Sequence, residues 1–156
     1  MQRRLGALFQ SHVALFAQLT VRPVSIAAAR DPLSRFAGWA QLSSDVGAVM
    51  RTRHAGYIAS NEHSIGATLA FYLRSTTVFQ TSEAIRYEFM PPVDQELLRR
   101  TAGLYVAAPA SDDLARLQAH FDSVELVSII WRSRGGDPID AYRVYELKGY
   151  RGGLPY

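Results

Sequence analysis

Polar side chains that could bind a ligand follow a short apolar segment of the sequence: Ser60, Asn61 and His63, just before an expected helix. Helix N-termini and the carboxyl ends of parallel strands attract anions, because unpaired backbone N–H groups point outward there. These three residues are therefore candidates for ligand binding. No glycine-rich phosphate loop accompanies them, since Gly56 precedes the segment and Gly66 lies inside the expected helix. Helix capping by Ser60 or Asn61 explains the same residues without a ligand, and both interpretations stay open.

Two arginines near the C-terminus form a second candidate group. Arg132 and Arg134 precede the turn sequence Gly-Gly-Asp-Pro at 135–138, and with Arg143 and Arg151 they could contact an anionic lipid or a sugar phosphate. The alternative is that these charges are solvated on an edge strand, where they would prevent two sheets from pairing edge to edge. The sequence leaves this choice open as well.

Catalytic and metal-binding patterns are missing from the rest of the sequence. There is no cysteine, which excludes thiol catalysis, disulfides and cysteine-ligated zinc. The four histidines, at positions 12, 54, 63 and 120, form no His-Glu-x-x-His pattern. The serines form no Gly-x-Ser-x-Gly turn of the kind that presents a nucleophile. We therefore expect no catalytic residue, no metal and no cofactor in this chain.

The composition is that of a single globular domain. The 156 residues are 48% hydrophobic and carry 17 basic and 14 acidic side chains, a net charge of +3. No basic run is longer than two residues, so we expect no nucleic-acid partner, which would need clustered positive charge. No apolar run reaches the roughly 20 residues that a membrane-spanning helix needs.

Short strands alternate with helices along the chain, which predicts an α/β fold: a mostly parallel sheet with helices on both faces and an antiparallel C-terminal hairpin. We expect Phe71, Leu117, Phe121 and Ile129 to be mostly buried. Asp31 as the cap and Pro32 at the first helical position predict a helix over 32–53. The other expected elements are a helix after residue 60, short helices at 93–100 and from 111 onward, and strands at 56–59, 76–80, 104–108, 124–132 and 141–148.

The N-terminal segment is expected to lie outside this domain. Residues 1–30 read as an amphipathic helix over 5–19 followed by a linker, and residues 31–156 as the soluble α/β domain. The apolar stripe of the helix needs cover, because burying its side chains is favourable. That cover could come from the domain itself or from a second copy, so residues 5–19 predict either self-packing or a homodimer.

Three groups of residues, in this order and spacing, resemble a known family. They are Asp31-Pro32 with Gly38-Trp39, the segment Ala-Thr-Leu-Ala-Phe-Tyr-Leu at 67–73, and the tail containing Arg-Gly-Gly at 134–136, Tyr-Arg-Val-Tyr at 142–145 and Gly-Tyr-Arg-Gly at 149–152. Over about residues 31–152 the chain resembles the extracytoplasmic C-terminal domain of bacterial family 39 glycosyltransferases, which are related to protein O-mannosyltransferases and lipid A aminoarabinose transferases.

The resemblance implies a Rossmann-like fold on the periplasmic side of the bacterial inner membrane. Members of this family transfer a sugar from a polyprenyl-phosphate donor, with a catalytic acid in an early extracytoplasmic loop. No residue of this sequence matches that catalytic motif, so the implied role is non-catalytic. The implied partners are the membrane-embedded domain of the same parent protein and a glycan or lipid-linked acceptor. The alternatives are a stand-alone module that binds a sugar phosphate or nucleotide, and a protein-interaction domain.

Overall fold

A computed structural model describes residues 32–82, 92–108, 110 and 113–154. The expected helix at 5–19, its linker and the homodimer through it lie outside the described residues. In chain order the elements are a 3-10 helix η1 (Pro32–Phe36), α3 (Trp39–Arg53), β1 (Tyr57–Ser60), α4 (His63–Tyr72), β2 (Thr77–Gln80), α6 (Gln95–Arg100), β3 (Gly103–Ala107), α7 (Leu114–His120), β4 (Phe121–Arg134) and β5 (Asp137–Tyr150).

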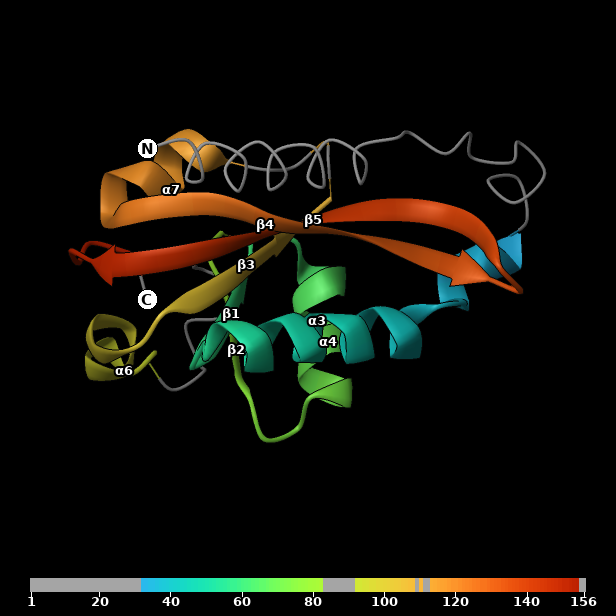
Figure 1. Cartoon of the computed structure of the whole chain (residues 1–156), viewed down its shortest axis with the longest axis horizontal. Coiled ribbons are helices and arrows are strands. Elements are labelled where there is room, and N and C mark those ends of the chain that lie inside the picture. Colours follow the sequence, from blue (N-terminus) through green and yellow to red (C-terminus); the bar gives the residue numbers. More distant parts are fainter. Residues whose placement is uncertain (1–31, 83–91, 109, 111–112, 155–156) are drawn as a thin grey trace, which may run out of the picture.

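The strands form one mixed sheet in the order β2-β1-β3-β5-β4 (Figure 1). Strand β1 pairs in parallel with β2 and β3, whereas β5 pairs antiparallel with β3 and β4. The predicted α/β class and antiparallel C-terminal hairpin are confirmed. The sheet is less parallel than the sequence predicts, because the hairpin supplies two antiparallel pairs beside the two parallel ones.

The β4–β5 hairpin is the longest feature of the fold. Each of its strands has 14 residues, several more than the sequence predicts, and two register shifts interrupt the pairing. Its turn is Gly135-Gly136, with φ of 59° and 93°. Two consecutive positive φ angles match the twist of a two-residue hairpin turn and favour glycine at both positions. The turn is therefore where the Gly-Gly pair predicts it.

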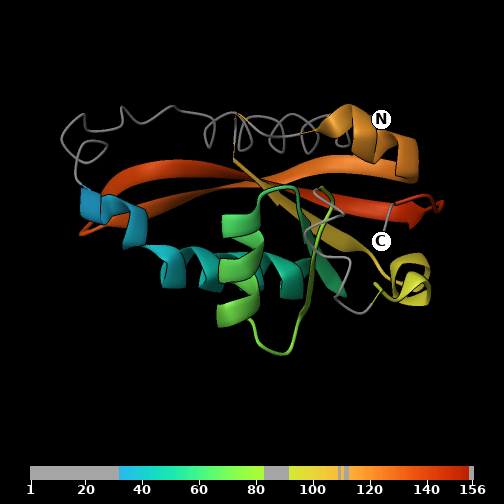
Figure 2. The same ribbon diagram turned by 180° about the vertical axis from the view of Figure 1, so that it is seen from behind.

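Helices cover both faces of the sheet. Residues of each central strand alternate between two buried clusters: Tyr57 and Ala59 of β1 belong to one, which includes residues of α6 and α7, while Ile58 belongs to the other, which includes residues of α3 and α4. This alternation is the two-residue period of a strand. Figures 1 and 2 show α3 and α4 together on one side of the hairpin and α7 on the other.

The helix predicted over 32–53 is interrupted. Gly38 has a φ of 77°, a left-handed conformation that ends η1 and lets α3 begin at Trp39. The Trp39 indole Nε1 donates a hydrogen bond to the Arg35 carbonyl oxygen at 2.7 Å, which closes this corner. The prediction of one continuous helix is wrong because it passed over the glycine, which takes this conformation at little cost.

The burial predictions are partly confirmed. Leu117 and Phe121 are each 2% exposed, and Phe121 is the first residue of β4. Ile129 is only half-buried. Phe71 is 61% exposed, so its predicted burial is wrong. The reason is helical geometry: α4 buries Leu69, and a residue two positions further lies about 200° around the helix, on its outer side.

Candidate functional site

The loop that follows β1 contains the first group of predicted site residues. Ser60 ends β1 and is fully buried, Asn61 is half-buried, and His63 is exposed as the first residue of α4. The helix is capped by Glu62, whose side chain makes no capping hydrogen bond. Capping by Ser60 or Asn61 is therefore wrong, because α4 begins later than predicted. The Ser60 hydroxyl accepts a hydrogen bond from the Glu62 N–H at 3.2 Å, ahead of the helix.

Side chains at the end of β2 hold this loop. The Gln80 side-chain amide donates a hydrogen bond to the Glu62 carbonyl oxygen at 3.2 Å, and the Ser82 hydroxyl donates one to the Asn61 carbonyl oxygen at 2.6 Å. Gly66 lies against the Gln80 amide, where a Cβ would collide with its nitrogen. Gly66 in α4 thus makes room for the Gln80 side chain. The carbonyl oxygens of Asn61 and Glu62 both accept hydrogen bonds from side chains of the protein.

Arg132, from the second predicted group, is 4% exposed. Its Nη1 donates hydrogen bonds to the carbonyl oxygens of Ser34 and Ala37, both at 2.7 Å, and its Nη2 pairs with the Asp140 carboxylate. The guanidinium also stacks on the Trp39 ring, 4.4 Å from the centroid. We call this set of five residues the Arg132 latch. It fastens η1 and the start of α3 to the hairpin, so the Arg132 charge serves the fold.

The other predicted arginine, Arg134, lies differently, and Tyr142 lies near residues of both predicted groups. Arg134 is exposed beside the hairpin turn. Burial raises the pKa of Tyr142, the Arg132 guanidinium lowers that pKa, and the Asp140 and Glu62 carboxylates raise it. The Tyr142 ring is therefore within electrostatic range of both the latch and the loop after β1.

Glu146 is a buried acid that was not predicted from the sequence. Glu146 on β5 is 3% exposed, and its carboxylate lies 2.9 Å from the Lys148 Nζ and 3.6 Å from an Arg53 guanidinium nitrogen. Residues two apart on a strand share a face. Lys148, the only lysine of the chain, therefore pointed in the sequence to an ion pair with Glu146. With two cations beside it, Glu146 is an ion-paired structural residue and not a free catalytic acid.

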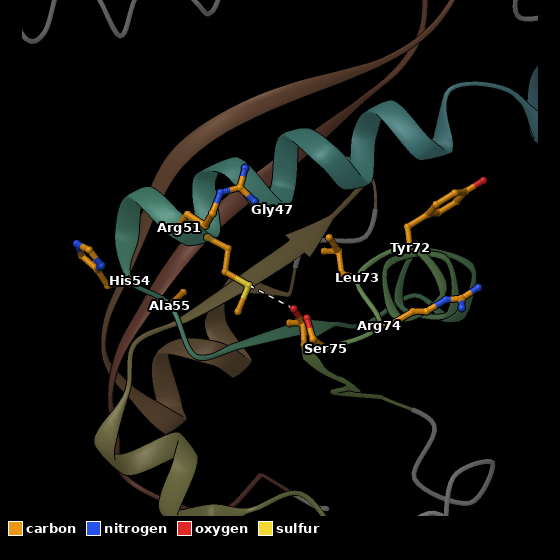
Figure 3. Close-up of a pocket in the computed structure, with 10 residues that line it drawn as sticks. Gly47, Arg51, His54, Ala55, Tyr72, Leu73, Arg74 and Ser75 are labelled. Atoms are coloured by element: carbon orange, nitrogen blue, oxygen red, sulfur yellow. Dashed lines mark hydrogen bonds between the residues drawn. The ribbon is translucent and has the colours of Figure 1, made fainter.

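A groove runs between the end of α3 and the connection from α4 to β2 (Figure 3). Its volume is about 820 Å³. No aspartate or glutamate lines it, and three basic residues do. We call it the α3–α4 groove. It is lined by Gly47, Met50, Arg51, His54, Ala55, Tyr72, Leu73, Arg74, Ser75 and Thr76.

The groove was not predicted from the sequence, although one backbone angle marks its edge. His54, which ends α3, has a φ of 53°. Glycine and asparagine favour this left-handed conformation, and a histidine in it carries a conformational cost. The Arg51 and His54 side chains come from the α3 side of the groove, and Tyr72 and Arg74 come from the α4 side (Figure 3).

Metal and membrane features were sought across the described ranges. There, no group of three or more acidic or histidine side chains could hold a metal ion. Within the same ranges no helix is both long and apolar enough to cross a membrane. Comparison of the chain with protein-family models, curated proteins and solved structures found no match.

Proposed function

We propose that this chain is a non-catalytic extracytoplasmic domain of a membrane glycosyltransferase of family 39, on the periplasmic side of a bacterial inner membrane. Its role would be to assist the acceptor or to organise the membrane-embedded domain of the same parent protein. The parent would transfer a sugar from a polyprenyl-phosphate donor.

The observation that carries this proposal is that motif residues from opposite ends of the chain pack together. The rings of Trp39 and Tyr142 lie 5.9 Å apart, and Trp39 stacks on Arg132, next to the Arg-Gly-Gly turn. A Cβ on Gly38 would collide with the Ser133 carbonyl oxygen and lie 2.8 Å from the Arg132 Cγ. The first and the last of the three motif groups therefore belong to one packed unit. A domain related to this family would require such packing.

The strand order supports a Rossmann-like fold for this domain. The parallel strands are ordered β2-β1-β3, so the chain leaves β1 toward one edge and returns to pair with β1 on its other side. Doubly wound folds bind ligands where the strand order reverses in this way, outside the carboxyl ends of the strands. The loop with Ser60, Asn61 and His63 follows β1 at that point. In this proposal it and the exposed Arg134 are the contacts for a glycan or lipid-linked acceptor.

A transfer assay tests the non-catalytic role. The purified chain is incubated with a polyprenyl-phosphate-linked sugar and with lipid and protein acceptors, and we expect no sugar transfer. Transfer by this chain alone would contradict the proposal. The genomic sequence upstream of the Met1 codon gives a second test, in which we expect a series of hydrophobic spans of about 20 residues each. Their absence from the same and the neighbouring reading frames would count against the membrane partner.

A stand-alone ligand-binding module is the second candidate function, and the cationic α3–α4 groove favours it. A ligand that binds only the folded state at a hundredfold excess over Kd adds about 2.7 kcal/mol to the free energy of unfolding. Melting the chain with sugar phosphates and nucleotides measures this gain. Amide shifts then separate binding at residues 60–63 from binding in the groove.

A further inference from the structure

We propose that residues 5–19 of this chain dock as an amphipathic helix on one face of the β4–β5 hairpin. We call this surface, formed by Ile129, Trp131 and Ala141, the Trp131 face. The proposal chooses between the two possibilities that the sequence leaves open, because it assigns the cover of residues 5–19 to the same molecule and not to a second copy. It does not depend on the glycosyltransferase family proposed above.

The register of the hairpin places the Trp131 face on the side of the sheet opposite α3. Ile130 pairs with Tyr142, and both belong to the buried cluster that includes residues of α3 and α4. Because side chains alternate along a strand, Ile129 and Trp131 point to the other side of the sheet. Ala141, the register partner of Trp131, lies on that side as well.

The buried clusters of the described residues do not include the Trp131 face. The cluster on the same side of the sheet contains Phe121 of β4, with Val124 and Leu126 packed against it, and it ends before Ile129. Within the described part of the chain, neither Ile129 nor Trp131 belongs to a buried cluster, and both are only half-buried. Apolar side chains of this size gain free energy when another surface covers them. The Trp131 face is therefore suited to a further apolar contact.

The residues that precede Pro32 can reach this face. The Arg132 latch holds the carbonyls of Ser34 and Ala37 against β4, so the described chain begins beside the hairpin turn, on the α3 side of the sheet (Figure 1). Elements that pack on opposite faces of a sheet lie about 20 Å apart, because each layer adds about 10 Å. The connection over residues 20–31 can span up to about 40 Å. It is therefore long enough to pass around the edge of β4.

The sequence of residues 5–19 suits an apolar surface of this size. The segment contains no lysine, arginine, aspartate or glutamate, and its apolar residues recur at helical spacing. A helix over 5–19 would be about 22 Å long, which matches half of a 14-residue strand. The apolar stripe consists of Leu5, Leu8, Phe9, Val13 and Phe16.

The covalent connection favours cover from the same molecule over cover from a second copy. A segment joined to its binding surface by a short flexible connection experiences that surface at an effective concentration on the order of millimolar. A second copy would reach this concentration only in a very concentrated solution. We therefore expect residues 5–19 to dock on their own domain.

Paramagnetic broadening of amide signals tests the docking in the full chain. The sequence has no cysteine, so Ser11→Cys provides a single site for a nitroxide label. We expect the label to broaden the amides of residues 127–133 and 139–143, and to leave those of α3 sharp. Broadening centred on Phe71, which is 61% exposed on α4, would overturn the proposal, as would a domain without broadening.

A mixed sample distinguishes self-docking from a second copy. Nitroxide-labelled chain without nitrogen-15 is mixed with unlabelled nitrogen-15 chain, and we expect no broadening of the hairpin amides. Broadening there as strong as in the directly labelled chain would show that a second copy supplies the cover, and would overturn the proposal.

Paired substitutions test whether the apolar stripe makes the contact. Phe9→Asp should abolish the hairpin broadening and lower the melting temperature by about 5 °C, because a charged side chain replaces a buried ring. Ala14→Asp is the matched control, since it adds the same charge off the stripe, and it should change neither measurement. Equal effects of the two substitutions would refute docking through the stripe.

Discussion

Replacing Arg132 with alanine should destabilise the protein more than any exposed arginine replacement. The change removes two hydrogen bonds from a charged donor to the carbonyl oxygens of Ser34 and Ala37, and the stacking contact with Trp39. Hydrogen bonds to charged groups contribute about 1.5–3 kcal/mol each, and a partly desolvated cation–π contact about 1 kcal/mol. The desolvation of the guanidinium offsets part of this sum, so we expect a loss of about 3 kcal/mol.

The Asp140 partner should matter much less than Arg132. Its side chain is 50% exposed, so water solvates the carboxylate when the ion pair is broken. Asp140→Asn should therefore cost at most about 1 kcal/mol. Arg132→Lys keeps the charge but lacks the planar fork that reaches two carbonyls and a carboxylate together, and its cost should lie between the two.

Urea unfolding followed by circular dichroism measures all three variants. With a slope near 2 kcal/mol per molar urea, a loss of about 3 kcal/mol lowers the midpoint by roughly 1.5 M. If Arg132→Ala and Asp140→Asn shift the midpoint equally, the carbonyl bonds and the ring contact contribute nothing beyond the ion pair. The reasoning about the latch would then be refuted.

Three further changes test single structural features. Gly38→Ala should cost about 2–3 kcal/mol, because Gly38 has a φ of 77° and a Cβ would lie 2.8 Å from the Arg132 Cγ; an unchanged melting temperature would contradict this. His54→Gly should stabilise the protein by about 0.5–1 kcal/mol in urea unfolding, because glycine takes the left-handed conformation without strain, and a loss would show that the imidazole makes an important contact. Tyr57→Phe should be neutral or stabilise by about 1 kcal/mol at pH 7, because the buried Tyr57 hydroxyl has no hydrogen-bond partner in the described structure. Burial, and to a smaller extent Tyr150, raises the pKa of Tyr57, so its contribution is present below the unfolded value near 10 and is lost as the pH rises above it. The variant should therefore lose less stability than the wild type between pH 9 and 11, and parallel curves would exclude Tyr57 as the cause.

Features set by neighbouring residues were predictable from the sequence. The hairpin turn follows from the Gly-Gly pair at 135–136, and the two faces of β5 follow from alternation: Tyr142 and Val144 join one cluster, and Tyr145 joins the other. The chemistry of these residues and the geometry of a strand determine both features without help from distant parts of the chain.

Features that join distant segments were not predictable in this way. Arg132 bonds to carbonyls 98 and 95 residues away, and no periodic pattern places them beside it. A surface position was expected, whereas the side chain is buried. The α3–α4 groove likewise exists only because the end of α3 meets the residues after α4. No sequence pattern therefore marked the residues that line it.

The Arg132 latch also determines how the domain responds to a pulling force. It fastens η1 to the hairpin near its turn, while Leu154 donates a hydrogen bond to the Tyr150 hydroxyl at the opposite end. A strand of 14 residues is about 45 Å long, so tension between Pro32 and Leu154 acts along β4 and β5. The covalent chain carries that tension from Arg132 around the turn and along β5 to Leu154, so the noncovalent contacts of η1 and α3 with the hairpin bear the force. The latch is therefore a contact whose rupture would detach η1 from the hairpin while β4 and β5 stay paired.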